Sequence, residues 1–67
     1  MHDYSFITMT KSSGEVIGVF IVNLGGKPES YIESLIEDNN KIHQSNSVNV
    51  IYRFSTEEEI MKYMLTH

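Results

Sequence analysis

Residues 16–22 form an unbroken apolar run, Val-Ile-Gly-Val-Phe-Ile-Val. A strand that is covered on one side alternates apolar with polar residues, whereas a continuously apolar run is typical of a strand buried on both faces. The run therefore predicts a central strand. A chain of 67 residues has little further material with which to cover both faces of that strand.

The small size also predicts that the fold needs support from outside its own core. A domain of this length buries only about 60% of the surface that its unfolded chain exposes, and small folds commonly add disulfides, a metal or a second subunit. The sequence contains no cysteine, which excludes disulfides and thiolate zinc sites. We therefore expect one compact domain over residues 1–67 that forms a homo-oligomer, in the simplest case a dimer.

The first part of the chain is predicted to be a β-hairpin with strands at residues 3–10 and 15–24. Turn-forming residues separate them, and a three-residue loop with Gly14 in the left-handed conformation places Lys11 opposite Glu15. In this register Phe6 pairs with Phe20, and one sheet face is purely aliphatic. That face consists of Ile7, Met9, Ile17, Val19 and Ile21. Either a helix from later in the chain or another subunit must cover it, and we predict the subunit, which makes this face the dimer interface.

The rest of the chain is predicted to add a helix, a strand and a second helix. Pro28 suits the first position of a helix that runs to about residue 44, although Asn39 and Asn40 could end it early. Residues 48–54 alternate as a strand, and Ser55 with Glu58 matches a capping box for a helix at residues 56–65. The fold class is therefore α+β, a small ββαβα domain in which a three-stranded mixed sheet carries two helices, with the second and third strands parallel.

Charged residues recur every four positions along the first predicted helix. Glu29, Glu33, Glu37 and Lys41 share one exposed side, so that like charges stack along most of it. A solvated helix face is the ordinary interpretation of such a row. The functional interpretation is an acidic stripe that binds a basic surface on a partner protein.

The turn formed by Gly25, Gly26 and Lys27 offers an alternative site. Glycines that precede a helix can expose backbone N–H groups to an anion. The full phosphate-loop motif is absent, because Pro28 removes a donor and Glu29 places negative charge beside the turn. A small anion- or nucleotide-binding domain that uses this turn therefore remains the alternative function.

No residue pattern indicates catalysis, a metal or a cofactor. His2, His43 and His67 lack the spacing of a metal-binding helix, and we expect them to be solvent-exposed. No nucleophile motif is present. Five basic residues against nine acidic ones provide no basic patch, so direct binding of nucleic acid is not expected. We predict no enzymatic activity.

The remaining expectations concern location and role. No leader peptide and no apolar run of membrane-spanning length is visible, which predicts a cytoplasmic protein without membrane contact. Met61, Met64 and Leu65 lie at helical spacing and could form an adaptable apolar patch for a partner, but we predict that they pack in the core. By elimination, the chain is predicted to be a non-catalytic protein-protein interaction module that modulates or inhibits a partner. A phage or mobile-element accessory protein acting on a host enzyme is one context that fits this description.

Overall fold

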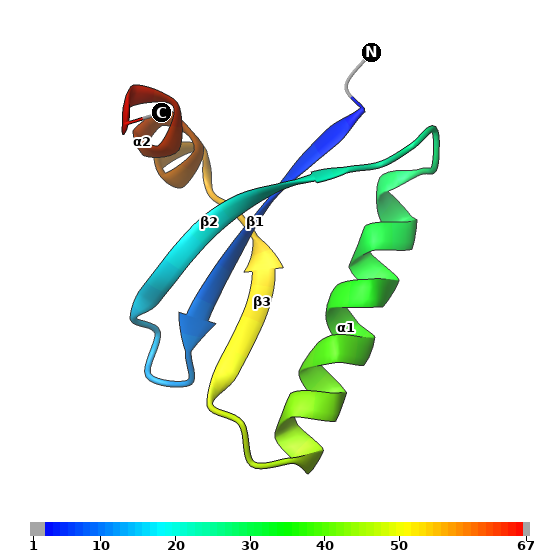
Figure 1. Cartoon of the computed structure of the whole chain (residues 1–67), viewed down its shortest axis with the longest axis vertical. Helices are drawn as coiled ribbons and strands as arrows, with labels where there is room; N and C mark the ends of the chain where they lie inside the picture. The colour runs from blue at the N-terminus through cyan, green and yellow to red at the C-terminus, as the bar shows by residue number, and fades with distance from the viewer. Residues whose placement is uncertain (1–2, 67) are drawn as a thin grey trace.

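The computed structural model describes residues 3–66, and within them it shows three strands and two helices (Figure 1). In chain order the elements are β1 (Tyr4–Lys11), β2 (Val16–Asn23), α1 (Glu29–Ser45), β3 (Val50–Phe54) and α2 (Glu57–Thr66). The element order ββαβα and the α+β class predicted from the sequence are confirmed.

The strands form one sheet in the order β2-β1-β3, in which β1 pairs antiparallel with both neighbours. β2 and β3 therefore run in the same direction, as predicted, but β1 separates them. Two expectations were wrong: the sheet is antiparallel rather than mixed, and the central strand is β1 rather than β2. The interior position of β1 is not visible from its hydropathy because three of its buried residues, Ser5, Thr8 and Thr10, are polar.

The turn between β1 and β2 has the predicted geometry. Gly14 has φ of 97°, which favours glycine because a side chain would be strained there. The N–H of Lys11 donates to the carbonyl of Glu15 at 2.8 Å, so these two residues face each other. The N–H of Gly14 donates back to the carbonyl of Lys11 at 2.8 Å and closes the loop. The prediction of a three-residue turn is confirmed.

A β-bulge follows this turn and was not predicted. Thr10 pairs with Val16, whereas Met9 pairs with Gly18, so Ile17 is an extra residue in β2. Because side chains alternate between the two faces of a sheet, one extra residue moves every later side chain of β2 to the opposite face.

The bulge reverses the predicted faces of β2. Phe6 pairs with Ile21, and Ile7 pairs with Phe20, instead of Phe6 with Phe20. Residues that pair across two strands lie on the same face of the sheet. Ile7 and Phe20 therefore face α1, while Phe6 and Ile21 lie on the opposite face, where α2 packs.

α1 packs on one face of the sheet and lies closest to β3. In Figure 1 the helix runs along β3. Ile7 in β1 and Ile32 in α1 are 2% and 4% exposed, and they are the buried apolar residues of the part of the chain that the structure describes. The ring of Tyr52 packs edge-on against Phe20, with a centroid distance of 6.2 Å, and lies 5.4 Å from the ring of His43. The core is thus thin and sits between β1, β3 and α1.

The outer edge of β3 is protected by a side chain from α1. Asn40 donates from Nδ2 to the carbonyl of Tyr52 at 2.9 Å, and its Oδ1 accepts from the N–H of Tyr52 at 2.8 Å. The side-chain amide thereby makes the two hydrogen bonds that a neighbouring strand residue would make. β3 is an edge strand whose middle is already paired.

The boundaries of α1 and β3 differ slightly from the predicted ones. Pro28 has φ of −71° and ψ of 157°, which makes it the residue before the helix rather than its first helical residue. Asn39 and Asn40 do not end the helix, which continues to Ser45. β3 begins at Val50 rather than at residue 48.

Candidate interaction surface

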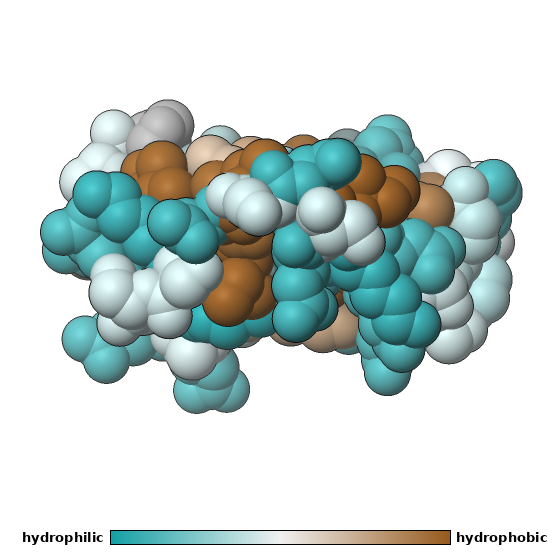
Figure 2. All heavy atoms as spheres, turned by 90° about the horizontal axis from the view of Figure 1, so that it is seen from below, coloured by the Kyte–Doolittle hydropathy of each residue, from teal (hydrophilic) through white to brown (hydrophobic). Residues whose placement is uncertain are grey.

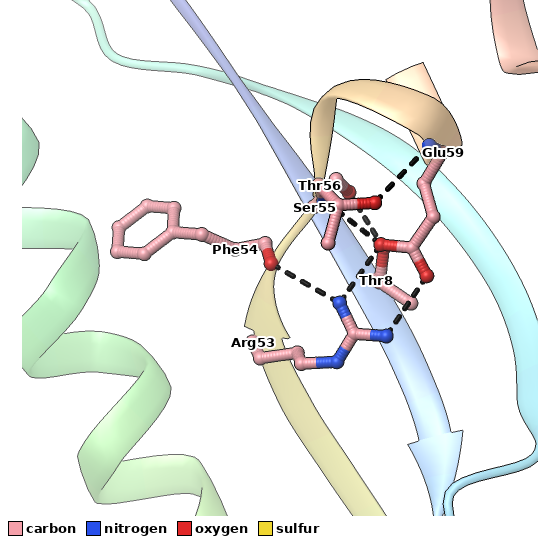
Figure 3. Close-up of polar contacts among 6 residues, drawn as sticks. All are labelled: Thr8, Arg53, Phe54, Ser55, Thr56 and Glu59. Atoms are coloured by element: carbon pink, nitrogen blue, oxygen red, sulfur yellow. Dashed lines mark hydrogen bonds and ion pairs between the residues drawn. The ribbon is translucent and has the colours of Figure 1, made fainter. Parts of the chain in front are cut away.

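α2 is attached to the sheet through a polar cluster around Glu59 (Figure 3). The guanidinium of Arg53 donates to both carboxylate oxygens of Glu59, with Nη1–Oε1 and Nη2–Oε2 distances of 2.8 Å. Thr8, which is 0% exposed, donates from Oγ1 to Oε1 of Glu59 at 3.0 Å. Since that proton is used, the hydroxyl of Ser55 is the donor in the 2.6 Å hydrogen bond to Thr8 Oγ1. We call Thr8, Arg53, Ser55, Thr56 and Glu59 the Glu59 cluster.

The capping box of α2 lies one residue later than predicted. The N–H of Glu59 donates to Thr56 Oγ1 at 3.2 Å, and the N–H of Thr56 donates to Glu59 Oε1 at 2.9 Å. Both Ser55 with Glu58 and Thr56 with Glu59 fit the capping-box pattern. The second pair forms because the hydroxyl of Ser55 is already used by Thr8.

The Glu59 cluster stays ionised at neutral pH. Hydrogen bonds from Arg53, and then from the N–H of Thr56, lower the pKa of the Glu59 carboxyl to about 2. The same hydrogen bond to Glu59 raises the pKa of Arg53 above its ordinary value. A carboxylate whose two oxygens are both bonded, and which does not exchange protons near neutral pH, is poorly suited to general acid–base catalysis. Its geometry fits an anchor for α2.

The apolar side of α2 faces away from the sheet. Met61, Met64 and Leu65 are 64%, 66% and 84% exposed, so the prediction that they pack in the core was wrong. Instead, α2 contacts the sheet through Tyr63, whose ring packs edge-on against Phe6 at a centroid distance of 5.8 Å. We call Met61, Met64 and Leu65 the α2 patch.

β2 carries the second exposed apolar region. Val16, Ile17, Phe20 and Ile21 are each between 40% and 46% exposed, although they lie on both faces of the strand. In Figure 2, apolar side chains reach the surface between hydrophilic ones along the flattened molecule. An apolar strand that remains half-exposed on both faces is unusual for a closed monomer.

The five residues predicted to form a dimer interface do not share one face. Ile7 is buried beneath α1, and Met9 lies on the same face as Ile7. Val19 and Ile21 lie on the opposite face, and Ile17 lies in the bulge. The expectation of a single aliphatic face was wrong because the bulge shifts β2 relative to β1 by one residue.

The acidic stripe lies on the solvent side of α1, as its spacing predicts. Glu29, Glu33, Glu37 and Lys41 are all exposed. Nζ of Lys41 lies 3.7 Å from Oε1 of Glu37, and both side chains are well exposed, so this ion pair is weak. The stripe therefore presents negative charge that is balanced only at the end near Lys41.

In the turn proposed for anion binding, backbone N–H groups are already hydrogen-bonded within the turn and its flanking residues. Gly25 and Gly26 have φ of 60° and 81°. The N–H of Gly25 donates to Oδ1 of Asn23 at 2.9 Å, and the N–H of Lys27 donates to a carbonyl within the same loop at 3.1 Å. The ammonium of Lys27 lies 4.1 Å from the centroid of the Tyr31 ring. The geometry is that of an ordinary turn before a helix, in which the N–H groups of Gly25 and Lys27 are bonded internally and are not directed at an anion.

No metal-binding group of His, Cys, Asp and Glu side chains occurs among residues 3–66. His43 is half-buried rather than solvent-exposed, and its Nδ1 is buried without a hydrogen-bond partner. His2 and His67 lie outside the described residues. Within the same range, neither helix has the length and apolar character needed to cross a lipid bilayer.

Comparison with known proteins yields no relative: no family model, no curated protein and no solved structure matches the chain.

Two features of this surface were not predicted from the sequence. The first is the Glu59 cluster, whose signal was the overlap of two capping-box patterns together with Thr8 in the middle of a strand. The second is the exposure of the α2 patch. Its only local signal is the apolar pair Met64 and Leu65 near the end of a short helix, and helical periodicity alone cannot tell which side of that helix the sheet will cover.

Proposed function

We propose that this protein is a non-catalytic interaction module that binds another protein and modulates it. The observation that carries the proposal is the distribution of apolar side chains. Among residues 3–66, thirteen large hydrophobic residues are at least 39% exposed, whereas two apolar residues are buried. Exposed apolar groups are normal when scattered, but contiguous ones mark interaction sites.

The α2 patch is the surface proposed to contact the partner. Met61 and Met64 have flexible thioether side chains that adapt to irregular apolar surfaces, and Leu65 adds the most exposed apolar side chain of the helix. α2 is held by a directional polar cluster rather than by burial of its own apolar residues, so these side chains remain available. An amphipathic helix of this kind fits an apolar groove on a partner.

The acidic stripe supports the same proposal through charge. Glu29, Glu33 and Glu37 are exposed on α1, and Glu29 lines a pocket together with Met64 of α2. Complementary charge accelerates association and selects partners more than it adds affinity. A partner with an apolar groove and a separate basic region would match both surfaces, and occupying that groove would inhibit whatever function the groove serves.

Affinity capture with matched variants tests the proposal. The wild-type protein should retain a partner that is lost when Met61, Met64 and Leu65 are all changed to Ser. The triple variant E29K/E33K/E37K should bind the partner more slowly and with less salt dependence. E57K/E58K is the control for charge reversal, because Glu57 and Glu58 are exposed acids outside the stripe. Capture that is equal for the wild type and for both triple variants would contradict the proposal.

A further inference from the structure

The described monomer is more open than a chain of its mass should be. Its accessible surface is 5118 Å², whereas a closed monomer of 7.7 kDa is expected to expose about 4300 Å². The difference, about 800 Å², is comparable to the area that each partner contributes to an interface of standard size. The Cα radius of gyration is 12.4 Å, compared with about 10.9 Å for a compact domain of this length. The molecule is a slab with extents of 36 × 27 × 15 Å.

The outer edge of β2 is the open side of this slab. β2 is the terminal strand of the sheet, and no other strand among residues 3–66 pairs with that edge. The N–H of Leu24 donates to the carbonyl of Asp3 at 2.7 Å. Because backbone groups of successive residues point alternately toward and away from the neighbouring strand, this bond determines which residues of β2 bond to β1. Phe20 therefore bonds toward β1, while the N–H and carbonyl groups of Val19 and Ile21 point outward.

β2 also lacks several of the features that normally protect an edge. Natural edge strands are short or carry charged residues or proline, and these features discourage pairing with another chain. β2 spans eight residues, Val16–Asn23, without a charge or a proline. Its bulge at Ile17 lies at one end and leaves the residues beyond it in regular pairing. The opposite edge, by contrast, is paired by Asn40.

Shallow grooves flank β2 on both faces of the sheet. The groove on the α1 face is lined by apolar side chains that include Phe20, Val22 and Leu35. A groove on the other face is lined by residues that include Val19 and Lys62. A strand added to the edge of β2 would place alternate side chains over these two grooves, which is the usual geometry of strand addition.

We propose that β2 pairs edge to edge with β2 of a second copy of this chain. The two strands run antiparallel about a two-fold axis, and the two sheets join into one continuous six-stranded sheet in the order β3-β1-β2-β2-β1-β3. The excess surface of the monomer is comparable to one side of a standard interface, and β2 has no charged residue that would repel its own copy. The apolar run of β2 then becomes interior, as such runs normally are.

The outward groups allow only registers in which odd-numbered residues of β2 face each other, and of these we infer the one that centres the pairing on Phe20. Val19 lies opposite Ile21 of the second copy, so that the outward N–H and carbonyl groups of both residues are bonded. Phe20 then lies on the two-fold axis, facing its own copy on the α1 side. This inference rests on the proposed interaction function and names one partner, while leaving the α2 patch for another protein.

Sedimentation equilibrium of three proteins at micromolar concentration tests this inference. The wild type should have twice the mass of the chain. The variant Ile21→Lys should be monomeric, because it places a charge at the edge, whereas Ile51→Lys should remain dimeric. Ile51 is 40% exposed compared with 43% for Ile21 and lies on the same face, but it belongs to the other edge strand. Circular dichroism establishes that each variant is folded.

Several results would overturn the inference. These are a monomeric wild type, a dimeric Ile21→Lys protein, or dissociation by Ile51→Lys to the same extent. If Ile21→Lys does not fold, a mixed sample of labelled and unlabelled wild-type chains decides the question. It should give intermolecular proton contacts between Val19 and Ile21, and their absence would overturn the inference. Capture of a partner through the α2 patch is unaffected by any of these outcomes, so the two proposals can fail separately.

Discussion

The two edges of the sheet differ in how they are protected. The outer edge of β3 is shielded by α1, and the side-chain amide of Asn40 pairs with both backbone groups of Tyr52. The outer edge of β2 has no strand beside it among residues 3–66, and four of its apolar side chains are at least 40% exposed. This small sheet protects one edge with a side chain of α1, whereas the other edge has no such protection and is the one proposed to pair with a second copy.

The two helices repeat this difference. α1 supplies Ile32, which is buried at 4% exposure beside the sheet. α2 supplies no buried residue and is held by the ionic and capping interactions of Glu59. Apolar packing therefore dominates where α1 meets the sheet, and directional polar contacts dominate where α2 meets it.

The largest effect on stability is expected in the core between β1, β3 and α1. Ile7→Ala should lower the free energy of unfolding by about 3 kcal/mol, because Ile7 is 2% exposed and its removal leaves a cavity beneath α1. Urea denaturation measures this change. Ile51→Ala is the control, and it should cost less than about 1 kcal/mol because Ile51 is 40% exposed. Equal losses of unfolding free energy for the two variants would show that Ile7 does not belong to a distinct core.

A smaller effect is expected at the anchor of α2. Glu59→Gln should lower the free energy of unfolding by about 2 kcal/mol, because it removes a charge-assisted, two-point hydrogen bond from Arg53 and weakens the cap at Thr56. Thermal denaturation with Glu58→Gln as the matched control measures it, since Glu58 is exposed and neighbours Glu59. A loss that is equal in both variants would mean that the cluster does not hold α2.

The same anchor should make stability depend on pH in the acid range. The pKa of Glu59 is about 2 in the folded protein and about 4.5 when unperturbed, so the unfolded state binds the proton first. The stabilisation by Glu59 is therefore complete above about pH 4.5 and is lost as the pH falls from there toward 2. Denaturation curves recorded across this window should show a steeper loss for the wild type than for Glu59→Gln. Parallel curves would contradict the assignment of this loss of stability to Glu59.

The smallest effect is expected at the protected edge. Asn40→Ala removes two hydrogen bonds and should cost about 1 kcal/mol. Asn39→Ala is the control, because Asn39 bonds back to the carbonyl of Leu35 within α1, and it should change stability by less than about 0.5 kcal/mol. Amide exchange at Tyr52 should become faster in Asn40→Ala alone. Unchanged exchange would show that Asn40 does not protect β3.

The sequence predicted the elements better than their pairing. Turn chemistry at Gly14 and the helical spacing around Ile32 are local signals, and both predictions were confirmed. The bulge at Ile17 has no such signal, since any residue of an apolar run can be the extra one, and it alone reversed the faces of β2.

The choice of central strand failed for a related reason. Hydropathy favours β2, because the buried hydroxyl of Thr8 makes β1 look half-solvated. That hydroxyl is satisfied by Ser55 and Glu59, which lie 47 and 51 residues away in the chain, and contacts of this length leave no local pattern. The exposure of Met64 and Leu65 could not be predicted either, because it depends on where Glu59 fixes α2.

The most direct test of edge pairing is amide hydrogen exchange along β2 at two protein concentrations. The N–H groups of Phe20 and Val22 point toward β1 and should be protected at both concentrations. Those of Val19 and Ile21 point outward and should be protected at high concentration but exchange quickly after dilution below the dissociation constant. Rapid exchange of Val19 and Ile21 at high concentration, beside protected Phe20 and Val22, would contradict the pairing of two copies through β2.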